Sequence, residues 1–183
     1  MNRKPAERGM AEMDELHRST SLRWKRRLGS IWRVLPMSKA GHVILIYHSV
    51  NGGPLSIAID KFSAQMAWLA KNAEVVSLDS LLSLEREAYP GLRVAITFDD
   101  GYRSVHDAAA PVLAKHKFPA TVYINSGHIH DTRHEHSDTL QGHYPDETFM
   151  TWSEVNHLQG QGWSIGSHGV EHLDLTAQPE AVV

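Results

Sequence analysis

The chain has 183 residues, of which 42% are hydrophobic and 21% charged, enough for one domain with a core and short for two. This composition excludes a wholly disordered chain, and the absence of cysteine excludes disulfides and thiolate metal sites. Charge is uneven, because ten Lys and Arg against four acids give residues 1–40 a charge of +6 and leave −9 for the remainder. We expect no nucleic-acid partner, and the 13 histidines direct attention to imidazole chemistry.

Residues 1–40 are predicted to be a basic leader that contains an amphipathic helix at residues 22–35. The apolar positions at helical spacing are Trp24, Leu28, Ile31, Trp32 and Leu35. Such a helix either contacts a membrane surface peripherally, with its basic residues on anionic headgroups, or docks on its own domain or a partner. No segment has the length and apolarity of a membrane span or a signal peptide, so the sequence favours a cytoplasmic or membrane-peripheral location.

Predicted strands and helices alternate from Gly41 onward. Strands are expected at 42–48, 74–78, 93–98, 119–125 and 162–168, and the first of them is expected to be buried. Helices are expected at 61–72, 80–88, 104–117 and 151–159. Repeated βα units with short connections predict a parallel sheet with helices outside it, either a barrel or an open sheet.

Local signals set the expected ends of these helices. Asp60 and Asp79 are predicted caps of the first two helices, and Pro111 must kink the third or lie near its end. "TWSE" (151–154) fits a capping box at the start of the fourth. A polar loop fills 126–149, and its histidines are expected to be solvated rather than to form an accessory metal site or a substrate groove. They are His128, His130, His134, His136 and His143.

Chemically distinctive side chains follow three of the predicted strands. His48 ends the first strand, Asp99 and Asp100 end the third, and His168 follows the last. The carboxyl ends of parallel strands meet at one edge of a sheet or barrel, where functional groups gather. We therefore expect these side chains to lie close together.

The adjacent carboxylates of Asp99 and Asp100 repel each other unless a cation lies nearby. Gly101 permits a sharp turn that brings both inward, although a "DDG" turn can also be solvated. His168 and His172 are four residues apart, so on a helical turn both imidazoles face one way, although such a pair can also be structural. Two imidazoles and one carboxylate leave open positions on a catalytic Zn²⁺ ion, or on the iron of an oxygenase. The repeated βα units and the extra carboxylate argue against the oxygenase.

Two quoted stretches carry a family resemblance: "TFDDG" (97–101) and, about 70 residues later, "SHGVEHLDL" (167–175). With their flanks they resemble the polysaccharide deacetylases, the chitooligosaccharide deacetylase homology domain, over residues 42–176. The resemblance implies an irregular (β/α) barrel. It also implies that Asp99 is the general base and that Asp100, His168 and His172 bind Zn²⁺ or another divalent metal.

The chain departs from the family pattern in three places. Gly169 stands where the family usually has Ser or Thr, and Leu173 where it often has Pro. The chain ends eleven residues after His172, where the family continues into an Arg-Pro-Tyr-like or Tyr-Pro-Tyr-like strand. Residues 41–183 therefore resemble the N-terminal portion of the domain, with the barrel incomplete at the C-terminus.

"LIYH" (45–48) resembles a circularly permuted branch, the deacetylases of β-1,6-linked N-acetylglucosamine exopolysaccharide, in which the strand carrying the general acid comes first. His48 is then the candidate acid. The resemblance implies metal-dependent N-deacetylation of an N-acetylated polysaccharide, usually outside the cytoplasm. The alternative is a truncated, catalytically impaired fragment that binds metal, glycan or a partner.

Overall fold

The computed structural model describes residues 41–52, 56–83, 89–132 and 148–178. Its strands are β1 (Gly41–Tyr47), β2 (Glu74–Val75), β3 (Leu92–Phe98), β4 (Thr121–Ile124) and β5 (Ser164–Ser167). They form one sheet in the order β1-β3-β4-β5, with β2 paired to β3, and all the pairs are parallel. The predicted parallel sheet is confirmed, and the described strands do not close into a barrel.

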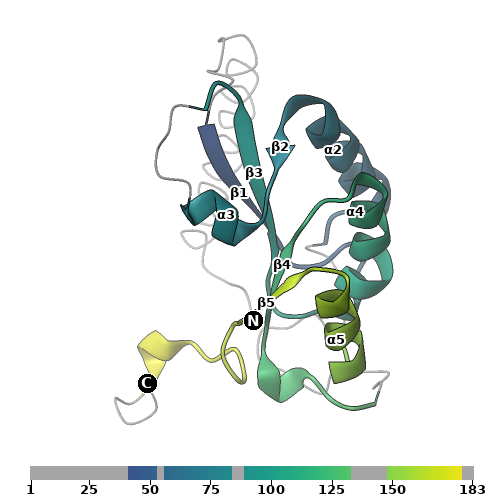
Figure 1. Ribbon diagram of the computed structural model, residues 1–183. Coiled ribbons are helices and arrows are strands. Elements are labelled where there is room, and N and C mark those ends of the chain that lie inside the picture. The colour runs from purple at the N-terminus through teal and green to yellow at the C-terminus, as the bar shows by residue number, and fades with distance from the viewer. Residues whose placement is uncertain (1–40, 53–55, 84–88, 133–147, 179–183) are drawn as a thin grey trace, which may run out of the picture. The chain divides into compact units, whose positions relative to one another are not determined.

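The helices cover the sheet mainly from one side. They are α2 (Ile59–Asn72), α3 (Leu78–Ser83), the π-helix η1 (Val105–Ala109), α4 (Ala110–His116) and α5 (Trp152–Gly160), with short 3₁₀ turns at Ser126–His128 and Leu175–Ala177. Figure 1 shows α2, α4 and α5 in a row along one side of the sheet. The helix–strand alternation predicted from residue patterns is present in the described residues.

Two of the predicted caps are wrong. Helix α2 begins at Ile59, so Asp60 lies inside its first turn and Ala58 takes the capping position without a side-chain bond. In α3, the hydroxyl of Ser77 accepts the N–H of Ser80 at 3.1 Å, so the cap lies two residues before the predicted Asp79. In both helices the acidic side chain still lies in the first turn, where a carboxylate interacts favourably with the helix dipole.

Pro111 lies in the first turn of α4, as its lack of an N–H requires, directly after the π-helix η1. A π-turn widens the backbone and removes the tight i−4 approach that proline disrupts in an α-helix. The predicted proline position is therefore confirmed. The π-turn that accommodates the proline has no obvious sequence signal.

An aromatic cluster anchors the core under the strand ends. The Phe98 ring stacks on Tyr47 at 5.6 Å between centroids and meets Trp163 at 5.5 Å. Phe62 of α2 meets the Tyr47 ring edge-on at 5.2 Å. Phe62 and Phe98 are fully buried, so the end of β3 is held rigidly where Asp99 begins.

The predicted burial of β1 is wrong. The strand pairs in full register with β3, yet Val43, Ile44 and Ile46 are 40%, 42% and 62% exposed. In the described part of the chain β1 is an edge strand, and the main contacts of helices with the sheet are those of α3 with β3, α2 with β2 and α5 with β5. An apolar run that would suit a buried strand therefore lies at the surface.

The basic leader at 1–40 and its predicted helix at 22–35 fall outside the described residues, which begin at Gly41. The same holds for His134, His136 and His143. Among the helices that are described, none combines the length and the apolar character needed to cross a bilayer.

Candidate metal centre

The two aspartates form a sharp, strained turn at the end of β3. The N–H of Asp99 donates to the Tyr47 carbonyl at 2.9 Å, which holds the residue beside the end of β1. Asp100 and Gly101 then take φ values of +72° and +80°. The turn predicted at Gly101 is present, and the left-handed conformation of Asp100 is an unpredicted strain of about 1–3 kcal/mol that the surrounding structure must support.

Gly101 is required for space as well as for its φ angle. A Cβ added there would lie 3.0 Å from the Ile124 side chain and 3.3 Å from that of Ile129. The Gly101 carbonyl accepts the N–H of Met150 at 3.0 Å. The turn is therefore packed on two sides. As a result, Asp100 is buried, at 3% exposure, and Asp99 is half-buried.

The two histidines reach Asp100 from an irregular loop after β5. The Nε2 atom of His168 lies 3.4 Å from Asp100 Oδ1, and the Nε2 atom of His172 lies 3.5 Å from the same oxygen. The loop has φ values of +104° at Gly169 and +52° at His172 rather than the expected helical turn. The departure to glycine at residue 169 coincides with the larger positive φ, which glycine adopts without strain.

Main-chain bonds from the end of β4 and from the loop after it hold this histidine loop in place. The N–H of His168 donates to the Ile124 carbonyl at 2.9 Å, and the N–H of Gly127 donates to that of Val170 at 2.8 Å. A Cβ on Gly127 would lie 2.8 Å from the Val170 carbonyl oxygen, so the approach requires a glycine. The separation of the imidazoles from Asp100 is thus set by backbone pairing.

These three side chains have the spacing of a metal site. Their ligand atoms all lie within 4.8 Å of one another. A tetrahedral ion with bonds of about 2.0–2.1 Å holds its ligand atoms about 3.3 Å apart, close to the 3.4 and 3.5 Å observed. The Asp100 side chain is 5% exposed, whereas those of His168 and His172 are 35% and 40% exposed. Ligands from solvent could therefore approach from the histidine side.

Asn125 is a site residue that the sequence reasoning missed. It follows β4, is fully buried, and its side-chain Nδ2 donates to Asp100 Oδ1 at 3.3 Å. Its Oδ1 has no hydrogen-bond partner among the described residues. The same rule that selected His48, Asp99 and His168, a polar residue directly after a strand, would have found it.

His48 and Asp99 lie at the same level of neighbouring strands, because the parallel register pairs Tyr47 with Phe98. His48 is exposed and follows β1 directly. All five predicted site residues thus follow the carboxyl ends of β1, β3 and β5. The structure brings Asp100, His168 and His172 into contact distance and aligns His48 with Asp99 through the backbone.

The interpretation of the loop histidines as solvated is wrong for His128. This residue is buried, and its ring stacks on Phe149 at 4.7 Å between centroids, although His130 is exposed. Burial holds the pKa of His128 below its usual value, partly offset by a hydrogen bond to the Glu171 backbone. His128 therefore supports the loop that carries His172.

Comparison with known proteins finds similarity to polysaccharide deacetylases. A sequence model of the family described as "Polysaccharide deacetylase" matches residues 87–183, more than half of the chain. The putative polysaccharide deacetylase YxkH of Bacillus subtilis (strain 168) is 31% identical over 136 residues, which is 72% of the chain and 43% of YxkH. The poly-beta-1,6-N-acetyl-D-glucosamine N-deacetylase of Staphylococcus epidermidis is 31% identical over 106 residues, 56% of the chain and 37% of that enzyme.

Among solved structures, IcaB from Ammonifex degensii matches with a TM-score of 0.59 at 26% identity, over 70% of the chain and 53% of IcaB. This likeness confirms the predicted fold class, a (β/α) barrel that the described strands leave open. The chain spans less than half the length of the two curated relatives, at 43% and 37%.

Proposed function

The chain belongs to the polysaccharide deacetylase family, and we propose that it carries out the metal-dependent hydrolysis of N-acetyl groups on a polysaccharide. The observation that carries the proposal is the convergence of Asp100, His168 and His172 at the strand ends, with ligand atoms at metal-binding separations. Members of the family generally depend on a divalent metal.

Zn²⁺ is the metal we propose for this site. Imidazole nitrogen and carboxylate oxygen are among its usual ligands, and three protein ligands leave a position open in a catalytic site. Asn125 supports the proposal, because its amide donates to the oxygen of Asp100 that faces the histidines and so orients the carboxylate. When bound, the ion would polarise an amide carbonyl and lower the pKa of water.

Asp99 is the proposed general base. Its carboxylate would accept a proton from the water that attacks the acetamide carbonyl. The main-chain bond to Tyr47 fixes its backbone next to Asp100, and its half-buried position leaves the side chain accessible to substrate. The proposal thus gives the two adjacent aspartates separate tasks.

His48 is the proposed general acid. As the C–N bond breaks, its imidazolium would donate a proton to the sugar nitrogen, which leaves as an amine while the acetyl group leaves as acetate. The alignment of His48 with Asp99 across β1 and β3 supports this role.

The proposed substrate is an N-acetylated polysaccharide, and within that class a β-1,6-linked N-acetylglucosamine exopolymer. The support is the likeness to the enzyme of Staphylococcus epidermidis and the position of His48 directly after β1, the first strand in the chain order of the described residues. Such a substrate implies action outside the cytoplasm, which stays a prediction.

A second candidate, a catalytically impaired fragment that binds metal or glycan, is favoured by one observation. The apolar side chains of β1 are exposed, with Ile46 at 62%. A strand of this composition at an uncovered edge favours association or instability. The oxygenase interpretation is contradicted by the family to which the chain belongs.

Acetate release separates the two candidates. The Zn²⁺-loaded chain is incubated with poly-β-1,6-N-acetylglucosamine, and acetate is measured before and after removal of metal with a chelator. The proposal predicts acetate release that stops on chelation and returns with Zn²⁺. Binding of Zn²⁺ through His168 without any release of acetate would contradict catalysis by this chain and support the binding fragment.

A further inference from the structure

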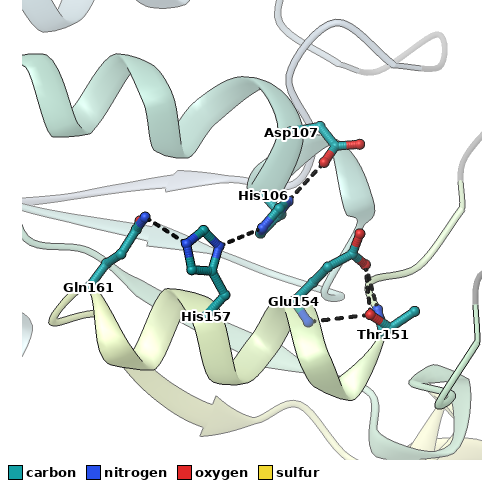
Figure 2. Close-up of polar contacts among 6 residues, drawn as sticks. All are labelled: His106, Asp107, Thr151, Glu154, His157 and Gln161. Carbon is teal, nitrogen blue, oxygen red and sulfur yellow. Dashed lines mark hydrogen bonds and ion pairs between the residues drawn. The ribbon is translucent and has the colours of Figure 1, made fainter.

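A second group of metal-ligating side chains lies on the helical side of the sheet, apart from the strand-end residues. His106 and Asp107 belong to η1, and Glu154 belongs to α5. One ligand atom from each lies within 4.8 Å of the others. Figure 2 shows the Glu154 carboxylate between Thr151 and the His106–Asp107 pair.

Glu154 is held firmly although it is buried, at 7% exposure. Its Oε2 accepts the N–H of Thr151 at 2.7 Å and the hydroxyl of Thr151 at 3.1 Å, within the capping box that begins α5. Oxygen ligands of metal sites are commonly oriented by hydrogen bonds of this kind. The capping box, predicted only as a helix start, thus also fixes a carboxylate in position.

A chain of hydrogen bonds runs outward from His106 (Figure 2). His106 Nδ1 lies 2.8 Å from Asp107 Oδ1, and His106 Nε2 lies 2.9 Å from His157 Nδ1. His157 Nε2 lies 3.1 Å from the side-chain nitrogen of Gln161. A charged Asp107 carboxylate only accepts, and in this amide orientation the Gln161 nitrogen only donates. Two neutral imidazoles therefore satisfy all three bonds when each has its N–H at Nδ1, with His157 donating to His106 and His106 donating to Asp107.

We propose that His106 Nδ1, Asp107 and Glu154 form a second binding site for a divalent transition-metal ion, with His157 as the outer partner of His106. One imidazole and two carboxylates are a donor set that Zn²⁺ accepts. The Asp107 side chain is 46% exposed. It can therefore move the few tenths of an ångström that an inserted ion requires.

Metal binding at this site needs no net loss of protons from the two histidines. His106 Nδ1 must give up its proton to bind the ion, and the proton moves in effect to Nε2, which then donates to His157 Nδ1. His157 in turn carries its proton on Nε2 and donates to the side-chain oxygen of Gln161 once that amide rotates. A metal-bound histidine commonly donates its other N–H to a fixed acceptor in this way.

The site opens into a pocket between the helices. The pocket has a volume of about 490 Å³, and His106, Asp107, His157 and Gln161 contribute to its lining. Water or an anionic group could therefore complete the coordination from that side. A bound ion would add a further link between η1 and α5, which are already joined by the hydrogen bond between His106 and His157.

Stoichiometric titration with Zn²⁺ tests the proposal, with a colorimetric chelator as competitor and Co²⁺ absorption as a second readout. The intact chain should bind two equivalents. Asp107→Asn and Glu154→Gln should each bind one equivalent, because each variant loses a ligand of the helix-side site. Both variants should fold, because Gln at 154 preserves the capping box and Asp107 lies at the surface. His157→Ala should weaken the second equivalent about 10–100-fold, and Gln159→Ala, on the exposed face of α5, is the control.

The same titration measures Zn²⁺ binding at the strand-end site separately. His168→Ala should lose one equivalent and keep the one that depends on Asp107. A single equivalent in the intact chain, abolished by His168→Ala and unaffected by Asp107→Asn and Glu154→Gln, would overturn the helix-side site and leave the proposed function intact. Two equivalents that both persist in Asp107→Asn would overturn it as well.

Discussion

The strand-end cluster and the helix-side cluster contain similar side chains on different scaffolds. At the strand ends, Asp100 and His172 occupy left-handed backbone conformations, and their approach depends on close glycine contacts. On the helical side, His106 and Glu154 lie in helices, and the carboxylate is held by an ordinary capping box. Two groups of residues that could bind a metal thus lie in one domain, one on a backbone with left-handed residues and one on helices.

This difference in backbone conformation leads us to expect different responses to mutation at the two clusters. Strain of about 1–3 kcal/mol at a non-glycine residue persists only where the surroundings over-determine the conformation, which is typical of active sites. The helix-side cluster carries positive φ at none of its described residues. We therefore expect the strand-end site to be sensitive to backbone changes and the helix-side site to be sensitive only to changes in its side chains.

The largest expected effect follows from removing an imidazole at the strand ends. His168→Ala should weaken Zn²⁺ binding at that site by more than about 100-fold, the upper range for an outer partner alone, because a direct ligand is lost. Zn²⁺ titration measures the effect, with His42→Ala in the exposed start of β1 as the matched control. Equal affinity in His168→Ala and the intact chain would contradict the strand-end metal site.

Asn125→Ala should have the next largest effect. The variant loses the amide that donates to Asp100, so Zn²⁺ affinity at the strand ends should fall about 10–100-fold, while binding that depends on Asp107 stays unchanged. Asn72→Ala, at the exposed end of α2, is the control. A parallel loss at both sites would indicate general unfolding instead of a local role.

Gly101→Ala and Gly162→Ala compare a crowded left-handed position with an open one. Gly162 has φ +90° and no heavy atom near an added Cβ, so we expect a loss of unfolding free energy of about 1–2 kcal/mol. Gly101→Ala adds a clash with Ile124 and should lose about 1–3 kcal/mol more. Urea denaturation measures both, and an equal loss would mean that the turn relaxes freely.

The smallest effect concerns pH and His128. Burial lowers the pKa of this histidine, so the unfolded chain takes up its proton at a higher pH than the folded one. Stability should be complete above the unfolded pKa of about 6.5 and fall as pH drops from there towards the folded pKa. His128→Phe, which keeps the stacking on Phe149, should reduce this fall in metal-free protein. An unchanged pH profile would show that His128 does not contribute.

The gathering of polar residues at the strand ends could be predicted because these residues directly follow recognisable strands. A parallel sheet brings such ends together whatever the loops do, so the position of His48, Asp99, Asp100 and His168 at one edge of the sheet follows from the strand pattern alone. The conformation of the loop after β5 could not be predicted in this way. Its histidine pair reaches Asp100 through positive φ values at Gly169 and His172 instead of through a helical turn. Asn125 obeys the same strand-end rule, because it directly follows β4.

The helix-side cluster and the exposure of β1 could not be read from local patterns. His106 and His157 are 51 residues apart and meet only because η1 packs on α5. The π-turn that presents His106 and Asp107 leaves no periodic signal. The apolar run of β1 predicts a strand correctly, but its burial depends on what covers the sheet edge, which local periodicity does not specify.

The separate roles of Asp99 and Asp100 are the central claim, and one paired measurement tests it most directly. Zn²⁺ stoichiometry and acetate release are measured on Asp99→Asn and Asp100→Asn, with Asp60→Asn, an exposed residue of α2, as the control. We predict that Asp99→Asn keeps the strand-end Zn²⁺ and loses turnover, whereas Asp100→Asn loses both. Equal loss of the strand-end Zn²⁺ in the two variants, or full turnover in Asp99→Asn, would contradict the account.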